Sequence, residues 1–97
     1  MKTIPEIEEL EDWREIRTNN FNQQVVYEFH NGFGASVILG KYSYGLEMML
    51  RTPSHINTKD KELRDKIENI DSDLLYDVVG YLTKERMEAI LYAIKDL

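Results

Sequence analysis

The stretch NGFGASVILGKYSYG, residues 31–45, combines four glycines, three aromatic residues and one lysine, which are residue types found in phosphate-binding loops. A P-loop has four residues between its first glycine and the Gly-Lys pair, and a Ser or Thr follows because its hydroxyl binds Mg²⁺. Here five residues separate Gly34 from Gly40, and Tyr42 follows Lys41. The spacing therefore excludes a P-loop.

The same glycines do not form a dinucleotide-binding fingerprint. A fingerprint that starts at Gly32 finds its second glycine at Gly34 but meets Val37 where the last glycine is needed. We interpret the stretch as a β-hairpin with glycines at turn and bulge positions, because glycine commonly occupies such positions.

Metal binding and acid–base catalysis have little support elsewhere in the chain. Asn69, Asp71 and Asp73 match the first three ligand positions of an EF-hand loop, and helix capping explains the same side chains. Leu74 and Gly80 stand where that loop needs glycine and glutamate. The chain has two histidines and no cysteine, so it offers no thiolate nucleophile or ligand. We expect no catalytic residue, no metal and no cofactor, and we predict that the protein is not an enzyme.

Lys41, Tyr42 and Tyr44 are the candidate partner-binding residues. Tyrosine rings presented by a hairpin bury contact area at little entropic cost, so they suit the recognition of another protein. The alternative is that both rings fold back over the sheet and complete its core. The sequence leaves this choice open.

The N-terminal region predicts an acidic helix. Thr3 and Glu6 match a capping box with Pro5 in the first turn, which favours a helix over about 5–17. The apolar residues recur at every third position, so their stripe drifts around the helix. We therefore expect this helix to lie across a neighbouring element. The apolar residues are Ile7, Leu10, Trp13 and Ile16.

Residues 24–52 predict three antiparallel strands joined by turns. The first strand begins at Gln24, where apolar and polar residues alternate and β-branched and aromatic residues are frequent. Residues 35–39 and 46–52 supply the second and third strands. Three strands with a helix over one face are enough for a stable sheet.

The first of these turns is predicted at Asn31-Gly32, because a type I′ turn needs positive φ at both central residues. A tight turn there would place Phe29 opposite Gly34, and the ring would cover the strand glycine. This pairing sets the expected register of the first two strands.

Helices are predicted in the second half of the chain. The mixed-charge run over 59–70 indicates a solvated helix, and Asp71 begins a short capped turn. Thr83 caps a helix over 83–96, whose apolar residues follow the 3.6-residue period. Whether a fourth strand forms between residues 53 and 76 is left open.

The predicted fold is a single α+β domain over residues 1–97. It contains a three-stranded antiparallel β-meander packed against α-helices, with an acidic N-terminal helix and C-terminal helices. The helix over 83–96 should cover one face of the meander.

Charge and composition restrict the partners and the location. The chain has 18 acidic and 12 basic residues, a net charge of −6, which repels the phosphate backbone, so we do not expect a nucleic-acid partner. No stretch approaches the roughly 20 apolar residues of a membrane helix, and the acidic N-terminus does not match a signal peptide. We therefore expect a cytoplasmic protein without a membrane partner.

The segments NGFGASV, KYSYG and DVVGYLT resemble the pattern NG(F/Y)GASV, YSYG and DV(I/V)GYLT of small bacteriophage and prophage proteins, mostly uncharacterised. The resemblance covers residues 31–45 and 77–97. It implies a phage-derived accessory protein in the host cell and no catalytic residue. By analogy we expect a protein-binding modulator of a host or competing-phage factor, such as an inhibitor of host defence. The alternatives are a homo-oligomeric accessory or structural phage protein, for example a homodimer, and an uncharacterised enzyme.

Overall fold

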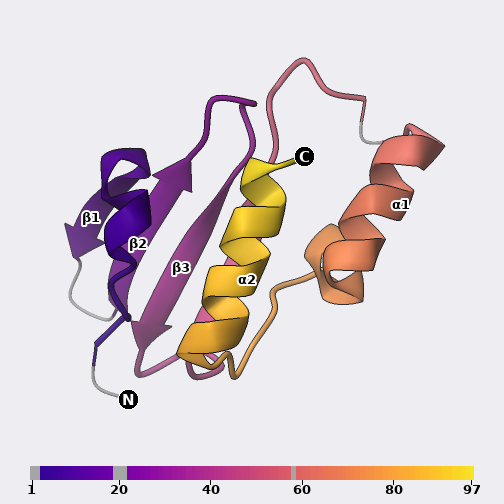
Figure 1. The fold of residues 1–97 in the computed structure, drawn as a ribbon. Helices are drawn as coiled ribbons and strands as arrows, with labels where there is room; N and C mark the ends of the chain where they lie inside the picture. The colour runs from indigo at the N-terminus through magenta and orange to yellow at the C-terminus, as the bar shows by residue number, and fades with distance from the viewer. Residues whose placement is uncertain (1–2, 19–21, 58) are drawn as a thin grey trace.

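The alternating segments between residues 24 and 52 form three strands of a four-stranded antiparallel sheet. The computed structural model describes residues 3–18, 22–57 and 59–97. The strand order β1-β2-β3-β4 follows the chain, and Figure 1 shows β1, β2 and β3 side by side. The strands are β1 (Arg14–Thr18), β2 (Asn22–Glu28), β3 (Gly34–Gly40) and β4 (Glu47–Arg51). The predicted α+β class and the antiparallel meander are confirmed, whereas the sheet has four strands rather than three.

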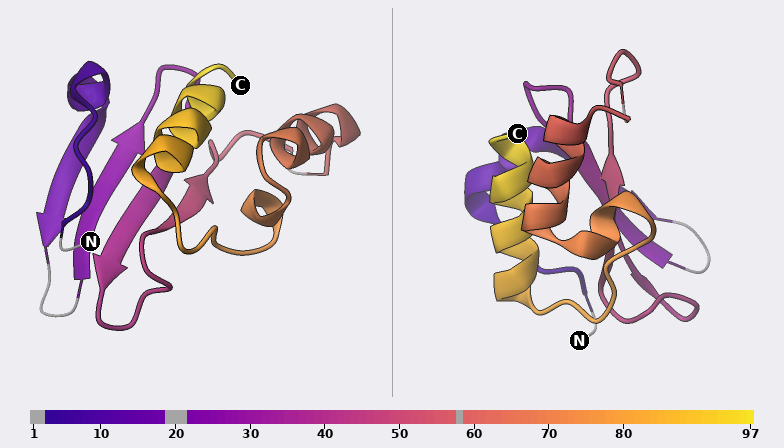
Figure 2. Two further views of the ribbon diagram at one scale, coloured as in Figure 1. Left: turned by 60° about the horizontal axis from the view of Figure 1, so that its bottom comes forward. Right: turned by 90° about the vertical axis from the view of Figure 1, so that its right-hand side faces the viewer.

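One face of the sheet carries the hydrophobic core, and the helices lie on it. Val25 and Tyr27 of β2 and Met48 of β4 are buried in this core, as the alternating pattern predicts. Figure 2 shows the helices on the same side of the sheet, and in Figure 1 the helix α2 (Lys84–Lys95) runs alongside β3. On the opposite face Glu28 and Met49 are open to solvent. The helical elements are η1 (Glu8–Trp13) and η2 (Ser72–Leu75), both 3₁₀, and α1 (Lys61–Ile70) and α2 (Lys84–Lys95).

The apolar stripe of α2 is the centre of the core. Four side chains on one face of this helix have no exposed surface, which confirms the prediction from their 3.6-residue period. They are Met87, Ile90, Leu91 and Ile94.

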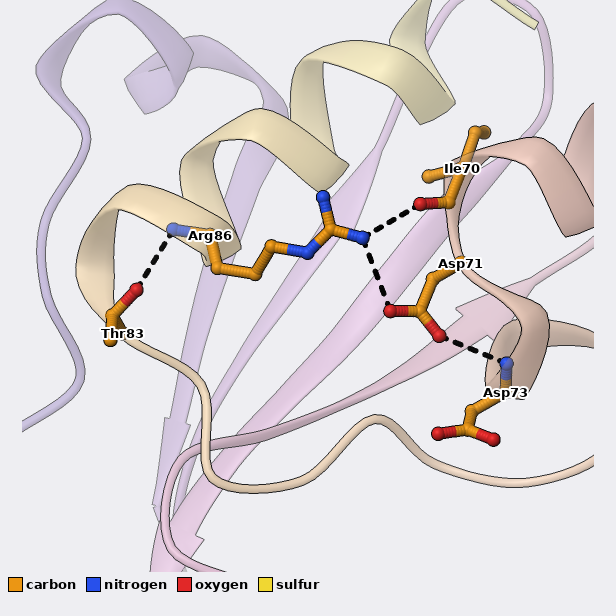
Figure 3. A network of polar contacts seen from close by, with 5 residues as sticks. All are labelled: Ile70, Asp71, Asp73, Thr83 and Arg86. Atoms are coloured by element: carbon orange, nitrogen blue, oxygen red, sulfur yellow. Dashed lines mark hydrogen bonds and ion pairs between the residues drawn. The ribbon is translucent and has the colours of Figure 1, made fainter.

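A polar network joins α1, η2 and the start of α2 (Figure 3). Thr83 Oγ1 accepts a hydrogen bond from the Arg86 N–H at 3.1 Å, which confirms the predicted cap. The Arg86 guanidinium donates to the carbonyl oxygen of Ile70 at 2.7 Å and to Asp71 Oδ2 at 3.2 Å. The other oxygen of Asp71 accepts from the Asp73 N–H at 2.9 Å. One arginine thus fixes the position of α1 relative to α2.

The predicted N-terminal helix over 5–17 is wrong. The chain forms the short 3₁₀-helix η1 and then the edge strand β1, and η1 begins after Ile7 without a side-chain cap. A 3₁₀-helix has three residues per turn, so it aligns apolar residues that recur at every third position. Ile7 and Leu10 are accordingly buried side by side in the core. The fourth strand therefore comes from the N-terminal region, and no strand forms in 53–57 or 59–76, with residue 58 outside the described part.

The first hairpin turn is one residue longer than predicted. Residues 30–32 form a three-residue loop in which Gly32, with φ of 84°, is the left-handed residue. The longer loop shifts the register, so Gly34 lies opposite Glu28. The predicted pairing of Phe29 with Gly34 is wrong.

Asn31 has a role that its turn preference does not predict. Its Nδ2 donates to the carbonyl oxygens of Ile94, Lys95 and Leu97 at 2.9, 3.0 and 3.2 Å. The last carbonyls of a helix lack partners within the helix, so this side chain acts as a cap for α2. The Asn31 Oδ1 accepts from the Phe33 N–H at 3.0 Å. The hairpin loop and the C-terminal end of α2 are thereby tied together.

Candidate functional site

Two loops that lie far apart in the sequence meet at the outer edge of β4. Residues 40–46 run from the last residue of β3 to the start of β4, and residues 79–82 lead into α2. Met48 and Val79 exchange two backbone hydrogen bonds of 2.9 Å, which form an antiparallel bridge. In Figure 1 both loops run along the lower end of the sheet. We call residues 40–46 and 79–82 the tyrosine loop pair.

Backbone hydrogen bonds continue from this bridge into the two loops. The Tyr81 N–H donates to the carbonyl oxygen of Tyr44 at 2.8 Å, and the Leu82 N–H donates to that of Leu46 at 2.9 Å. Leu46 and Leu82 are buried in the core. Each loop is therefore anchored by a leucine beside an exposed tyrosine.

Two glycines allow the loops to approach closely. A Cβ atom on Gly80 would lie 2.9 Å from the Cβ of Tyr44. A Cβ atom on Gly45 would lie 3.2 Å from Cδ1 of Tyr81. Each loop thus places a glycine against the tyrosine of the other loop, and a larger residue would push the loops apart.

Tyr81 has a strained backbone. Its φ is 53°, and it is the one residue other than glycine with positive φ in the described ranges. A left-handed conformation costs a residue with a Cβ atom about 1–2 kcal/mol. The hydrogen bond to Tyr44 and the burial of Leu82 hold this conformation in place.

The tyrosine side chains of both loops face solvent. Tyr42, Tyr44 and Tyr81 are 69%, 61% and 79% exposed. The alternative in which Tyr42 and Tyr44 complete the core is therefore wrong. Lys41 Nζ lies 5.6 Å from the centre of the Tyr42 ring, and the ring centres of Tyr44 and Tyr81 are 6.4 Å apart.

The backbone of the first loop is held by two polar side chains. Ser43 Oγ accepts from the Gly40 N–H at 2.9 Å and donates to the carbonyl oxygen of Gly45 at 2.7 Å. The Tyr44 N–H donates to Glu47 Oε2 at 2.9 Å, and Glu47 is buried. The loop therefore presents its tyrosines from a backbone that is fixed before any partner binds.

No protein-family model, curated protein or solved structure matches this chain. The resemblance to phage proteins consequently stays a prediction, as does the kind of partner that it implies. What the site can do must follow from its own side chains.

The structure brings the three predicted partner-binding residues, Lys41, Tyr42 and Tyr44, into one loop and adds Tyr81 to them. Sequence reasoning missed Tyr81, although the segment DVVGYLT contains it, because no periodicity links residues 44 and 81. The sequence does contain one signal, which is Tyr44-Gly45 in one segment and Gly80-Tyr81 in the other. In the structure the glycine of each pair lies against the tyrosine of the other pair.

Two further findings concern the chemistry of the described residues. They include no group of three or more His, Cys, Asp or Glu side chains that could hold a metal ion. None of their helices is long and apolar enough to span a membrane.

Proposed function

We propose that the protein acts by binding another protein through the tyrosine loop pair. The observation that supports this best is the exposure of three tyrosines, Tyr42, Tyr44 and Tyr81, on two loops that are hydrogen-bonded to each other. A tyrosine has few rotatable bonds, so it loses little entropy when a partner immobilises it. Its ring buries apolar area, and its hydroxyl can keep a hydrogen bond at the interface.

The strain at Tyr81 also supports a binding role. A glycine at position 81 would relieve the left-handed backbone, yet the chain has a large exposed aromatic side chain there. Backbone strain of this kind concentrates at functional sites, because folding stability alone would remove it.

The partner is proposed to be a protein of host or competing-phage origin, which would make this chain a modulator within the host cell. The sequence resemblance supports this finer assignment. The tyrosine loop pair supports a partner surface with apolar recesses for the rings, rimmed by acidic groups that can face Lys41.

Affinity capture from a bacterial lysate tests the proposal. The wild-type chain should retain one or a few proteins, and Tyr42→Ala, Tyr44→Ala and Tyr81→Ala should each weaken that retention. Truncation of an interface anchor costs about 2 kcal/mol or more, which corresponds to roughly a 30-fold loss of affinity. Identification of the retained protein distinguishes a foreign partner from a second copy of this chain.

The matched control is Tyr76→Ala, since Tyr76 is 68% exposed but lies outside the tyrosine loop pair, next to η2. This variant should retain the partner as the wild type does. Circular dichroism must show that all four variants fold. Equal capture by the loop variants and by Tyr76→Ala would refute the proposal.

A further inference from the structure

A cavity of about 550 Å³ lies at the β1 edge of the sheet, opposite the edge that carries the tyrosine loop pair. Its walls are the N-terminal segment 3–6 and parts of β1 and β2. Figure 1 shows this segment on the same side of the sheet as α2. The volume falls within the range of about 300–1,000 Å³ that is common for ligand pockets.

The walls of this cavity are mainly apolar. Ile4 and Val25 line it and are otherwise buried, and the Ile4 N–H donates to Gln23 Oε1 at 3.1 Å, which ties the N-terminal segment to β2. Ile16 of β1 lies beside Val25 in the sheet and also lines the cavity, but it is 61% exposed. A large aliphatic side chain is thus left uncovered inside a concave site.

Two buried polar atoms in the cavity wall lack a well-aligned hydrogen bond. Arg14 and Tyr27 are neighbours in the β1–β2 ladder and both line the cavity. Arg14 Nη1 and Tyr27 Oη are buried and form no well-aligned hydrogen bond within the part of the chain that the structure describes, although the Arg14 side chain lies close enough to the Tyr27 hydroxyl to lower the pKa of Tyr27. Buried polar groups nearly always have a hydrogen-bond partner, so these two atoms indicate a missing one.

The charges around the cavity define what that partner would be. Arg17 also lines it, but its guanidinium already pairs with Glu15 at 2.8 Å. Arg14 forms no ion pair with any described residue. Glu6 lies at the cavity and is exposed. The wall therefore carries two charges without an ion-pair partner among the described residues, the guanidinium of Arg14, which is partly buried, and the exposed carboxylate of Glu6.

We propose that this cavity binds a small molecule that has one anionic head group and an apolar body. The Arg14 guanidinium is a donor that suits the oxygens of a carboxylate or a phosphate monoester, and the Tyr27 hydroxyl, which is closed to solvent, can join it as a second donor only after a local shift of the cavity wall. Ile16 and Val25 form the surface for the apolar body. Burial raises the pKa of Tyr27, with partial compensation from Arg14, so its hydroxyl keeps its proton at neutral pH.

Titration of the ¹⁵N-labelled protein with hexanoate, hexyl phosphate and 1-hexanol tests the assignment by NMR. At least one of the two anions should produce saturable shifts of the amides in β1 and in residues 23–27, and their relative affinities distinguish a carboxylate from a phosphate ligand. Hexanol has the same chain without the charge, so it should bind at least about tenfold more weakly. Equal binding of hexanol, or no saturable shift with either anion at millimolar concentration, would overturn the proposal.

Three variants localise the head group. Arg14→Gln removes the guanidinium charge and should weaken anion binding by at least about tenfold. Tyr27→Phe removes a hydroxyl that forms no well-aligned hydrogen bond, so it should fold normally and still bind the anion more weakly. Arg51→Gln on β4 removes the same charge outside the cavity and should bind like the wild type.

If Tyr27→Phe binds like the wild type, or if Arg51→Gln weakens binding as much as Arg14→Gln, the proposed head-group site is wrong. This test is independent of the proposed protein-binding function. Tyr42→Ala alters the tyrosine loop pair and should bind the anion as the wild type does.

Discussion

Replacement of Tyr81 by glycine should stabilise the fold, although it removes a large aromatic side chain. Glycine adopts positive φ without strain, so the variant gains the about 1–2 kcal/mol that the left-handed conformation costs tyrosine. The greater freedom of glycine in the unfolded chain reduces this gain by about 0.4–1 kcal/mol. The ring is 79% exposed and contributes little packing. At the middle of both ranges the net gain in the free energy of unfolding is about 0.8 kcal/mol.

Thermal denaturation followed by circular dichroism measures this gain. For a domain of this size 1 kcal/mol shifts the Tm by roughly 4–8 °C, so Tyr81→Gly should raise it by about 3–6 °C. The matched control is Tyr42→Gly, because Tyr42 is 69% exposed and its φ is not positive. Its Tm should stay the same or fall.

The two glycine variants decide whether strain at Tyr81 is real. If Tyr42→Gly and Tyr81→Gly change the Tm in the same direction and by the same amount, backbone strain at Tyr81 does not explain the result. Tyr81→Gly should also weaken partner capture while it raises the Tm. Loss of binding together with higher stability could not be caused by unfolding.

Four further predictions concern the core, the hairpin and the buried tyrosine. Ile90→Ala should lower the free energy of unfolding in urea by about 2–5 kcal/mol, because the side chain is fully buried; a loss well under 1 kcal/mol would place it outside the core. Asn31→Ala should lower it by about 1–2 kcal/mol through loss of the α2 cap, and an unchanged urea midpoint would show that this cap is dispensable. Gly34→Ala should abolish the dispersed NMR spectrum, since its Cβ would overlap the Tyr27 carbonyl oxygen; a native spectrum would contradict this contact. Burial raises the pKa of Tyr27 above 10.0, so the unfolded tyrosine ionises first and stability should fall as the pH rises past that value. Tyr27→Phe should make this fall smaller in urea titrations on either side of that pH.

The spacing of apolar residues predicted the elements that bury one regular face. The alternation from Gln24 and the 3.6-residue stripe around Ile90 correctly located β2 and α2, because each pattern matches the face that the fold buries. The three-residue period of Ile7 and Leu10 was also in the sequence. We assigned it to an α-helix with a drifting apolar stripe, whereas a three-residue period matches the three residues per turn of the 3₁₀-helix η1.

Tertiary contacts determined the features that the sequence did not predict. The local preference of Asn31-Gly32 favours a two-residue turn, but the Asn31 side chain caps α2, which lies more than sixty residues away. At Gly80-Tyr81 the glycine would be expected to take the positive φ. In the structure the small size of Gly80 allows it to lie beside Tyr44, and Tyr81 is the residue with positive φ. The exposure of Tyr44 and Tyr81 follows from this contact between the two loops, and no pattern in the neighbouring sequence predicts it.

The order of the strands has a consequence for the speed and sequence of folding. Each strand pairs with the next one along the chain, so the sheet forms by closing short loops, and this carries a small entropic cost. The contact between Asn31 and Ile94 joins residues 63 positions apart, so it closes a much longer loop. We therefore expect the meander to form early and α2 to dock late. Weakening of the Asn31 contact would then accelerate unfolding more than it slows refolding.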